Sequence, residues 1–429
     1  MQHAVLNDPE TMKIIIFGLV GLFSIGKLSA QRACTSSEYQ QRQLNNNPGL
    51  TQKMKEIEQF TQRYGLEIAS SVVNAGANHV QVFKIPVVIH ILYHRQDENI
   101  NDEQVKSQIA AINRDFRKRN TDTANTPAAF KSIAADCEIE FELARVDAKG
   151  RYTTGILHKY SPITTWEMDD KIKFSSEMGD DAWDSKSYLN IWVGNVRGLL
   201  GYSSLPGDAQ EKDGVVISNS AMGTFNTPAP YNLGRTMVHE VGHWLGLKHL
   251  WGDADCGDDL VDDTPRQSGF TSGCPSGVRI SCGNSPNGDM YMNYMDFTND
   301  ACMNMFTNGQ KQRMRAMFAP GGFRYSILFS KAFGEPTVDE IVLPEASPQW
   351  LQVKIFPNPV TSQLTLNLAY DPRWIGKEFI ITNMMGQVEI RNTISSKVQK
   401  IDVSRLKPGV YFIAADREGE KIREKFVKM

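Results

Sequence analysis

The hydrophobic and polar positions of residues 64–333 follow two periods, one typical of buried strands and one of amphipathic helices. Residues 82–93 are β-branched and apolar without interruption after Pro86, which predicts a strand buried on both faces. Residues 101–119 carry apolar side chains at helical spacing, and Asn101 is a suitable cap for that helix. Further strands are predicted at residues 137–146, 189–196 and 215–219, the last two separated by a glycine-rich loop.

A second helix is predicted in the stretch HEVGHWLGLKH, residues 239–249. Gly246 can adopt the positive φ that ends a helix and turns the chain back. The chain order is then a strand, a helix, several strands and this second helix. That order predicts an α+β domain with a mixed sheet and the second helix packed beneath it.

The pattern changes after about residue 333. Residues 334–350 are rich in proline and acidic residues and are expected to form a linker. Residues 351–429 contain short alternating segments separated by Asn and Gly, which predicts a small all-β sandwich. This sandwich has no cluster of His, Cys or acidic residues, so we infer no chemistry from it.

The N-terminal 30 residues have the pattern of a secretory signal. One basic residue precedes an apolar run at 14–25, which is too short to span a bilayer, and small residues follow. Met12 is the expected translation start, because the acidic Asp8 and Glu10 are unusual in such a signal. The pattern predicts export through the periplasm, with no membrane span in the mature protein.

Residues 31–63 form a polar leader with a helical patch at 52–60. Composition alone is also compatible with a disordered tail. Cys34 favours a pro-segment, because a thiolate can occupy the open position of a catalytic metal until the leader is cut, with Arg63 as the expected cut point. A spare or intermolecularly paired thiol is the alternative.

The net charge and the cysteine content indicate which classes of protein fit the sequence. The net charge of −3 gives no indication of nucleic-acid binding. Six cysteines in an exported chain predict disulfides, and four of them lie between residues 256 and 302. Cys137 lies in an expected strand and is interpreted as a buried small hydrophobic residue.

The stretch at residues 239–249 carries the candidate chemistry. His239 and His243 lie one helical turn apart on the same face, so both can bind one metal ion. His249 arrives after Gly246 as a third ligand, and three protein ligands leave a position open on a catalytic zinc. Glu240 points off the ligand face, which suits a general base acting on a water molecule that the zinc activates.

An acidic loop follows the third histidine. Six aspartates fall within residues 253–263, and so many carboxylates repel one another unless a hard cation gathers them. Calcium is the expected cation, and a solvated acidic loop is the alternative. The tentative ligands are Asp253, Asp259, Asp262 and Thr264.

The pattern HExxHxxGxxH resembles the signature of the metzincin peptidases, and within that clan the chain is similar to the pappalysin family. The motifs that carry the similarity span residues 31 to about 330. They are Arg32-Ala33-Cys34, residues 239–251, GDDLVDDTP at 257–265, Gly273-Cys274-Pro275, Asn293-Tyr294-Met295-Asp296 and Cys302. The resemblance implies a metzincin-like catalytic domain with a zinc helix, an irregular lower lobe and a cleft whose edge strand pairs with an extended peptide.

Several site assignments follow from this resemblance. It implies that Met295 lies beneath the histidines as a structural floor, and it also implies calcium in the acidic loop. The implied disulfides are Cys256 with Cys282 and Cys274 with Cys302. Asp300 matches an acidic residue tied to a preference for Arg or Lys just after the cut bond, for which a carboxylate facing a guanidinium is the physical reason.

The sequence departs from the family at Phe297, where relatives have a tyrosine. Phenylalanine cannot donate a hydrogen bond to an oxyanion, so that role is not transferred. Zinc itself, Tyr291 or Tyr294 would have to supply it.

The C-terminal region resembles the sorting domain of the type IX secretion system, through FPNP at 356–359, Met385-Gly386-Gln387, LKPGVYF at 406–412 and a basic end. This implies export to the cell surface or beyond, with the secretion machinery as a partner. The expected function is a secreted zinc endopeptidase acting on extracellular proteins. The alternatives are a calcium-binding surface adhesin with a vestigial zinc site and a non-peptidase zinc amidase.

Overall fold

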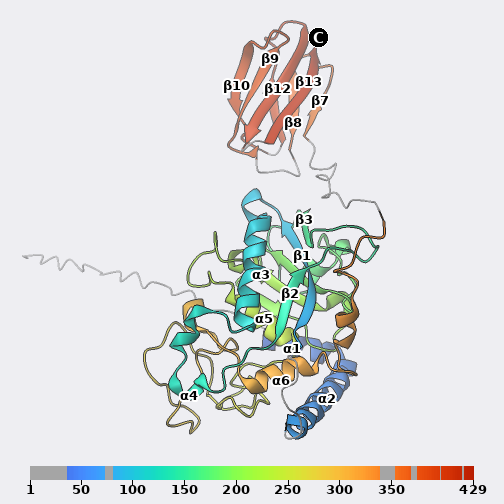
Figure 1. The fold of residues 1–429 in the computed structure, drawn as a ribbon. Helices are drawn as coiled ribbons and strands as arrows, with labels where there is room; N and C mark the ends of the chain where they lie inside the picture. The colour runs from blue at the N-terminus through green and yellow to red at the C-terminus, as the bar shows by residue number, and fades with distance from the viewer. Residues whose placement is uncertain (1–35, 73–80, 339–352, 369–373, 397, 418–419) are drawn as a thin grey trace, which may run out of the picture. The chain divides into compact units, whose positions relative to one another are not determined.

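The computed structural model describes residues 36–72, 81–338, 353–368, 374–396, 398–417 and 420–429. The expected signal at 1–30 and Cys34 lie outside these residues. In the N-terminal part, a mixed sheet is accompanied by helices, as Figure 1 shows. The helices are α1 (Ser36–Asn46), α2 (Pro48–Val72), α3 (Asp102–Phe116), α4 (Ala128–Lys131), α5 (Arg235–Trp244) and α6 (Asn308–Ala316).

The mixed sheet has the strand order β2-β1-β4-β6-β5, and β3 also pairs with β1. All pairs are parallel except that between β5 and β6, and β5 forms one edge. The strands are β1 (Phe83–Tyr93), β2 (Ile139–Leu143), β3 (Ile156–Tyr160), β4 (Leu189–Gly194), β5 (Gly201–Ser203) and β6 (Gly214–Ser218).

Both faces of this sheet are buried, as the continuous apolar run in β1 predicted. In β4, Ile191 and Val193 belong to the core shared with α3 and α5, whereas Trp192 belongs to a separate apolar cluster. Since successive side chains of a strand point to opposite faces, that second cluster lies on the other face of the sheet. Helix α3 begins after Asn101, whose side chain accepts a hydrogen bond from the backbone N–H of Gln104, which confirms the expected cap.

Two strands were missed in the sequence. Strand β5 is a three-residue segment that contains a glycine, and it lies in the predicted glycine-rich loop. Strand β3, with the sequence ILHKY, has no clean alternation. Short strands of this kind are stabilised by neighbouring strands more than by their own residues.

The polar leader is helical rather than a disordered tail over its described residues. Helix α1 contacts α2 and β5, and α2 packs against α6. Helix α2 continues past Arg63 to Val72, so the expected boundary at residue 63 lies inside one helix.

Between α5 and α6 the described chain has irregular structure, with the 3₁₀ helix η7 (Asp300–Cys302) and isolated bridges. This is the expected irregular lower lobe. Disulfides join Cys256 to Cys282 and Cys274 to Cys302 across it. Cys137 is a buried free thiol, and burial raises its pKa far above the ordinary value.

The C-terminal part contains two antiparallel sheets with one shared apolar core, which confirms the predicted sandwich. Their strand orders are β10-β9-β12-β13 and β11-β8-β7. The strands are β7 (Lys354–Phe356), β8 (Gln363–Asn367), β9 (Glu378–Asn383), β10 (Val388–Thr393), β11 (Val398–Asp402), β12 (Gly409–Arg417) and β13 (Glu420–Lys428).

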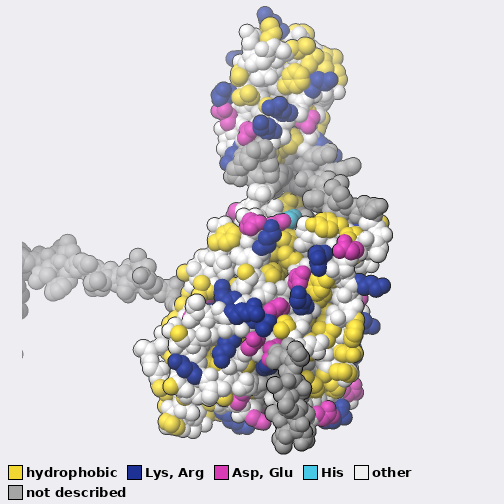
Figure 2. Space-filling model, in the orientation of Figure 1, with side chains coloured by type: hydrophobic (Ala, Val, Ile, Leu, Met, Phe, Trp, Pro, Cys, Tyr) yellow, Lys and Arg dark blue, Asp and Glu magenta, His cyan; other side chains and the backbone are white. Residues whose placement is uncertain are grey.

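The surface carries both signs of charge. On the face in Figure 2, Lys and Arg side chains of the N-terminal part have Asp and Glu side chains among them. Arg145 and Glu142 are one exposed ion pair among the described residues. Among the described helices, none is long and apolar enough to cross a membrane.

Candidate zinc site

The zinc-site helix α5 is fully buried and ends in a Schellman motif. The N–H of Leu247 donates to the carbonyl of Gly242, and the N–H of Gly246 donates to that of His243. Gly246 has φ of +85°, which a residue with a Cβ would adopt at a cost. The turn reverses the chain and brings His249 back against the helix, as the sequence predicted.

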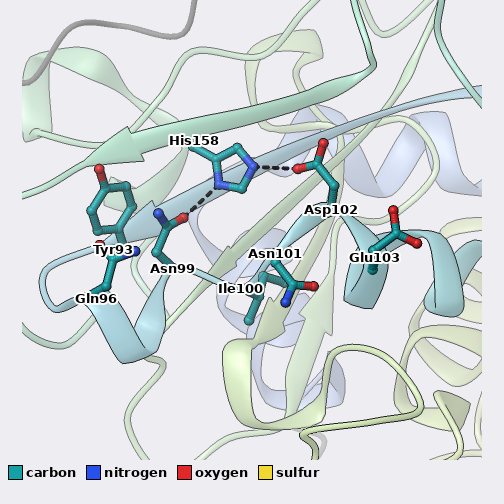
Figure 3. A pocket seen from close by; sticks show the side chains of 8 residues that line it. All are labelled: Tyr93, Gln96, Asn99, Ile100, Asn101, Asp102, Glu103 and His158. Carbon is teal, nitrogen blue, oxygen red and sulfur yellow. Dashed lines mark hydrogen bonds and ion pairs between the residues drawn. The ribbon is translucent and has the colours of Figure 1, made fainter. Parts of the chain in front are cut away.

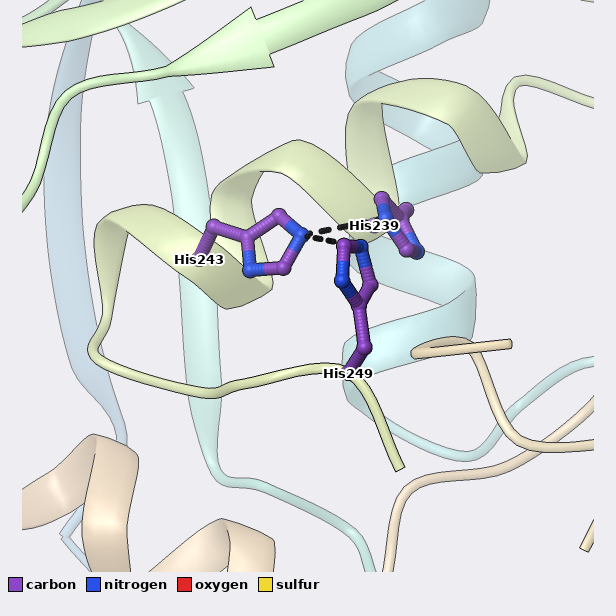
Figure 4. A group of neighbouring side chains, drawn as sticks. All are labelled: His239, His243 and His249. Carbon is purple, nitrogen blue, oxygen red and sulfur yellow. Dashed lines mark hydrogen bonds between the residues drawn. The ribbon is translucent and has the colours of Figure 1, made fainter. Parts of the chain in front are cut away.

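The three histidines converge through their Nε2 atoms (Figure 4). Nε2 of His243 lies 3.1 Å from Nε2 of His239 and 3.1 Å from Nε2 of His249. Two nitrogen ligands of one tetrahedral zinc, each about 2.0–2.1 Å from the ion, lie roughly 3.3 Å apart. The spacing therefore fits three ligands of a single zinc.

The other ring nitrogen of each histidine fixes the tautomer. Nδ1 of His239 lies 2.6 Å from the carbonyl oxygen of Tyr294, and Nδ1 of His243 lies 2.9 Å from that of Leu247. Nδ1 of His249 lies 2.6 Å from Oδ1 of Asp253. Carbonyl oxygens only accept, so Nδ1 carries the proton in His239 and His243, and the Asp253 carboxylate favours the same tautomer in His249. Each Nε2 then presents its lone pair to the metal.

Burial favours the neutral imidazole that a metal ligand requires. Burial first, and the neighbouring His249 second, lower the pKa of His243 to about 4. The donor set of three neutral imidazoles suits zinc.

Glu240 lies on α5 beside the first ligand and is 1% exposed. It adjoins the edge strand, because a Cβ added to Gly201 of β5 would lie 3.0 Å from Cγ of Glu240. The candidate base therefore lies directly beside the edge strand, and a larger residue at position 201 would press on Cγ of Glu240 and on the carbonyl oxygen of Val216.

Met295 packs against α5 at Gly242. A Cβ added to Gly242 would lie 2.5 Å from Sδ of Met295, so the glycine is required for this close approach. Met295 is fully buried, and the backbone of the preceding Tyr294 holds His239. The arrangement matches the hydrophobic floor that the sequence resemblance implied.

Phe297 belongs to an aromatic group around His249. Its ring centroid lies 4.9 Å from that of His249 and 5.0 Å from that of Trp251, whose ring stacks on His249 at 4.5 Å. Tyr294 is fully buried, and its ring lies against Phe306 and the Arg235 guanidinium. The expectation that zinc itself, Tyr291 or Tyr294 stabilises the oxyanion therefore stays a prediction.

The acidic loop is organised differently from the expected calcium site. The Asp253 carboxylate orients His249, so the structure gives it a partner in the zinc site. Asp259 and Thr264 do lie together, with the Thr264 hydroxyl 2.8 and 2.9 Å from the two carboxylate oxygens. Asp262 is exposed. Among the described residues, the loop aspartates do not form a group of three whose ligand atoms lie within 4.8 Å of one another.

Burial raises the pKa of Asp259 to about 7, although hydrogen bonds from Thr264 and Val261 oppose the shift. A nearby cation would stabilise the ionised form of this carboxyl group, which burial disfavours. Asp263 is used elsewhere, since it accepts hydrogen bonds from the Thr307 hydroxyl and the Gly309 N–H at the start of α6.

Asp300 is fully buried beside the start of α5. Its Oδ2 lies 2.8 Å from the N–H of Leu233 and 3.3 Å from that of Arg235. The carboxylate therefore stabilises the N-terminal end of the zinc helix. The sequence did not indicate this structural role.

The leader reaches the site through Ser37. Its hydroxyl lies 2.5 Å from Oδ1 of Asp253 and 3.0 Å from Nδ1 of His249. Ser37 follows Cys34 by three residues. Glu58 on α2 forms a second anchor through both oxygens with Arg313 of α6.

A separate surface pocket of about 640 Å³ lies near the start of α3 (Figure 3). The His158 imidazole bridges Asn99, at 2.6 Å, and Asp102, at 2.9 Å. It thereby ties β3 to the start of α3. This pocket shares no lining residue with the zinc site.

The fold and the three-histidine site together define a zinc metallopeptidase of the metzincin type. Residues 173–319 match the model of the peptidase M43 family, described as pregnancy-associated plasma protein-A. Residues 354–429 match the secretion system C-terminal sorting domain.

An extracellular metalloprotease of Pyricularia oryzae is 46% identical over 127 residues, which are 28% of this chain and 44% of that protein. The chain thus spans less than half of that relative. Mature mirolysin of Tannerella forsythia, in complex with a cleaved peptide, is 45% identical with a TM-score of 0.57, over 58% of this chain and 96% of that chain.

A promirolysin mutant of Tannerella forsythia is 39% identical with a TM-score of 0.63, over 72% of this chain and 100% of that chain. The chain belongs to the M43 family of pappalysin-like metallopeptidases. The sorting domain and the extracellular relatives indicate a protein that is secreted or held at the cell surface.

Proposed function

We propose that the protein is an endopeptidase made as a zymogen, which hydrolyses peptide bonds of extracellular proteins and prefers Arg or Lys just after the cut bond. The observation that carries the proposal is the convergence of three Nε2 atoms, with each Nδ1 held by an acceptor, next to the buried Glu240.

Zinc, when bound by His239, His243 and His249, would polarise the carbonyl of the substrate and acidify a water molecule. Glu240 would take a proton from the attacking water on its carboxylate and pass it to the leaving amine. The open edge of β5 would bind the substrate backbone in an extended conformation, because among the described strands β5 pairs with β6 alone.

The zymogen part of the proposal rests on the contact of Ser37 with Asp253 and His249. A segment that passes this close to the ligands would let Cys34 reach the metal as a thiolate. Because α2 is continuous through Arg63, we place the activating cut between Val72 and Phe83 rather than at residue 63. The name promirolysin, given to a similar structure, also supports a latent form.

The preference for Arg or Lys rests on Asp300, whose buried carboxylate lies at the start of α5. Calcium, with Asp259 and Thr264 among its ligands, is proposed as a structural ion of the acidic loop. Partners would be protein substrates and the type IX secretion machinery.

The experiment that tests the proposal is cleavage-site profiling with the full chain and its Glu240→Gln variant on a denatured protein mixture. We expect new termini that begin with Arg or Lys, and a rate reduced about 10²- to 10⁴-fold in the variant, which removes the base but keeps the zinc ligands. Both chains are first cut between Val72 and Phe83 by limited proteolysis, so that the leader no longer blocks the site. Equal cleavage of the mixture by both activated chains, or none by either, would refute the peptidase and favour the adhesin or the amidase.

A further inference from the structure

A pocket on the sheet face opposite the zinc helix is filled by a side chain of the leader. Tyr39 of α1 is 0% exposed there and belongs to the same apolar cluster as Trp192 and Tyr202. Its hydroxyl lies 2.9 Å from both carboxylate oxygens of Asp170, and its ring centroid lies 4.9 Å from that of Tyr202. A residue of the leader thus forms part of the core of the main domain.

The pocket also contains a buried cation. The Lys173 ammonium is 0% exposed and lies 2.9 Å from Oδ1 of Asp170. It lies 5.3 Å from the ring centroids of Tyr39 and Tyr202 and 5.5 Å from that of Trp192. Three aromatic rings therefore surround one ammonium group, and the leader supplies one of them.

Two side chains that line the pocket, Lys173 and Trp192, also form hydrogen bonds within the main domain. Lys173 donates to the carbonyl of Lys212, and the Trp192 indole donates to the carbonyl of Asp180. Burial alone would raise the pKa of Asp170, but Lys173 and the hydrogen bond from Tyr39 keep it below the ordinary value. The pocket is therefore a carboxylate and ammonium pair lined by aromatic rings, and Gln43 of the leader also donates to Asp170 at 3.1 Å.

The chemistry of this pocket selects a phenol. A tyrosine offers a ring face to Lys173 and an O–H donor to Asp170, whereas phenylalanine would leave the buried carboxylate without that donor. A lysine or arginine side chain would face the like charge of Lys173.

The pocket lies close to the zinc site along the chain. Ser37, which contacts His249, precedes Tyr39 by two residues. Gly201, which contacts Glu240, immediately precedes Tyr202. One peptide can therefore contact the zinc ligands and fill the pocket.

We infer that the pocket formed by Asp170, Lys173, Trp192 and Tyr202 is a binding site for a tyrosine side chain of a peptide, with Tyr39 as its resident occupant. The opening of the pocket in the mature enzyme rests on the proposed function, because it requires loss of the leader. The binding of Tyr39 itself requires no catalysis.

The test uses the full chain with Glu240→Ala, so that the outcome is independent of peptidase activity. A recognition sequence for a specific protease is placed between Val72 and Phe83, the chain is cut, and dissociation of the N-terminal segment is followed by gel filtration. Tyr39→Phe should release the segment at least about tenfold faster, since hydrogen bonds to charged groups are worth a tenfold to hundredfold change. Gln41→Ala, an exposed position on the same helix, is the matched control and should not change the rate.

A free peptide with the sequence of residues 36–46 provides a second measurement on an unchanged protein. It should block rebinding of the segment, and its version with Tyr39→Phe should need about a tenfold higher concentration. Asp170→Asn should reduce the difference between the two peptides. Equal release rates for Tyr39 and Tyr39→Phe, or equal potency of the two peptides, would overturn the inference and leave the proposed peptidase untouched.

Discussion

The buried carboxyl group of Asp259 predicts an unusual dependence of stability on pH. Its pKa is about 7 in the folded protein, against an ordinary value of 3.8. Between these values the folded state holds a proton that the unfolded state has lost. The stabilising contribution is therefore fully present below about pH 4 and is lost as the pH rises through 7.

The magnitude follows from the size of the shift. About three pKa units correspond to roughly 4 kcal/mol as an order of magnitude, and the side chain is almost wholly buried, so solvent screening is small. Asp259→Asn keeps an acceptor for Thr264 and Val261 but has no charge. Compared with the variant, the natural chain should therefore lose a few kcal/mol of stability between pH 4 and pH 8.

The assay is urea unfolding of both chains across this pH range, with and without calcium. Calcium bound here should raise the free energy of unfolding of the natural chain at pH 8 by RT ln(1 + [Ca²⁺]/Kd). The increase should be smaller at pH 5, and it should be small for the variant at either pH. Parallel pH profiles of the two chains would refute the buried-acid reasoning. Equal effects of calcium on both would refute calcium binding at Asp259.

Three further predictions test the zinc site and the lower lobe. Asp253→Gly suits the local φ of +59° and removes the orienting carboxylate, so zinc affinity in chelator competition should fall about 10- to 100-fold; unchanged affinity would contradict that role. Gly242→Ala should lower the free energy of unfolding by about 1–3 kcal/mol, and adding Met295→Ala should relieve the clash; a penalty unaffected by Met295→Ala would contradict it. Replacing Cys256 and Cys282 by Ser should lower the free energy of unfolding by about 3 kcal/mol, measured by thermal unfolding, because their bridge closes a loop of 26 residues. An unchanged free energy of unfolding would contradict a stabilising role of this disulfide.

The main elements of the fold could be predicted because their signals are local. The continuous apolar run of β1 and the cap at Asn101 appear in short windows of sequence. The C-terminal end of helix α5 could also be predicted, because Gly246 has a positive φ, which glycine adopts most readily. Strand β5 could not be predicted, because it is formed by pairing with β6 rather than by its own three residues.

The ligands of the zinc site were evident from spacing, but their supports were not. Asp253 follows His249 by four residues in an irregular loop, where spacing does not indicate contact. The sequence therefore placed it among the calcium ligands, in a crowd of similar aspartates. Tyr39 and Asp170 lie 131 residues apart, and a polar leader offers no pattern that would pair them.

The orientation of the three histidines has a consequence for how the gene can change. Two of the acceptors that hold Nδ1 are main-chain carbonyls, of Tyr294 and Leu247, and the third is the side chain of Asp253. A codon change at position 294 or 247 replaces a side chain but leaves the carbonyl in the chain. Of the three acceptors, Asp253 is the one that a single point mutation can remove. Position 253 is therefore where one substitution can weaken zinc binding without changing a ligand.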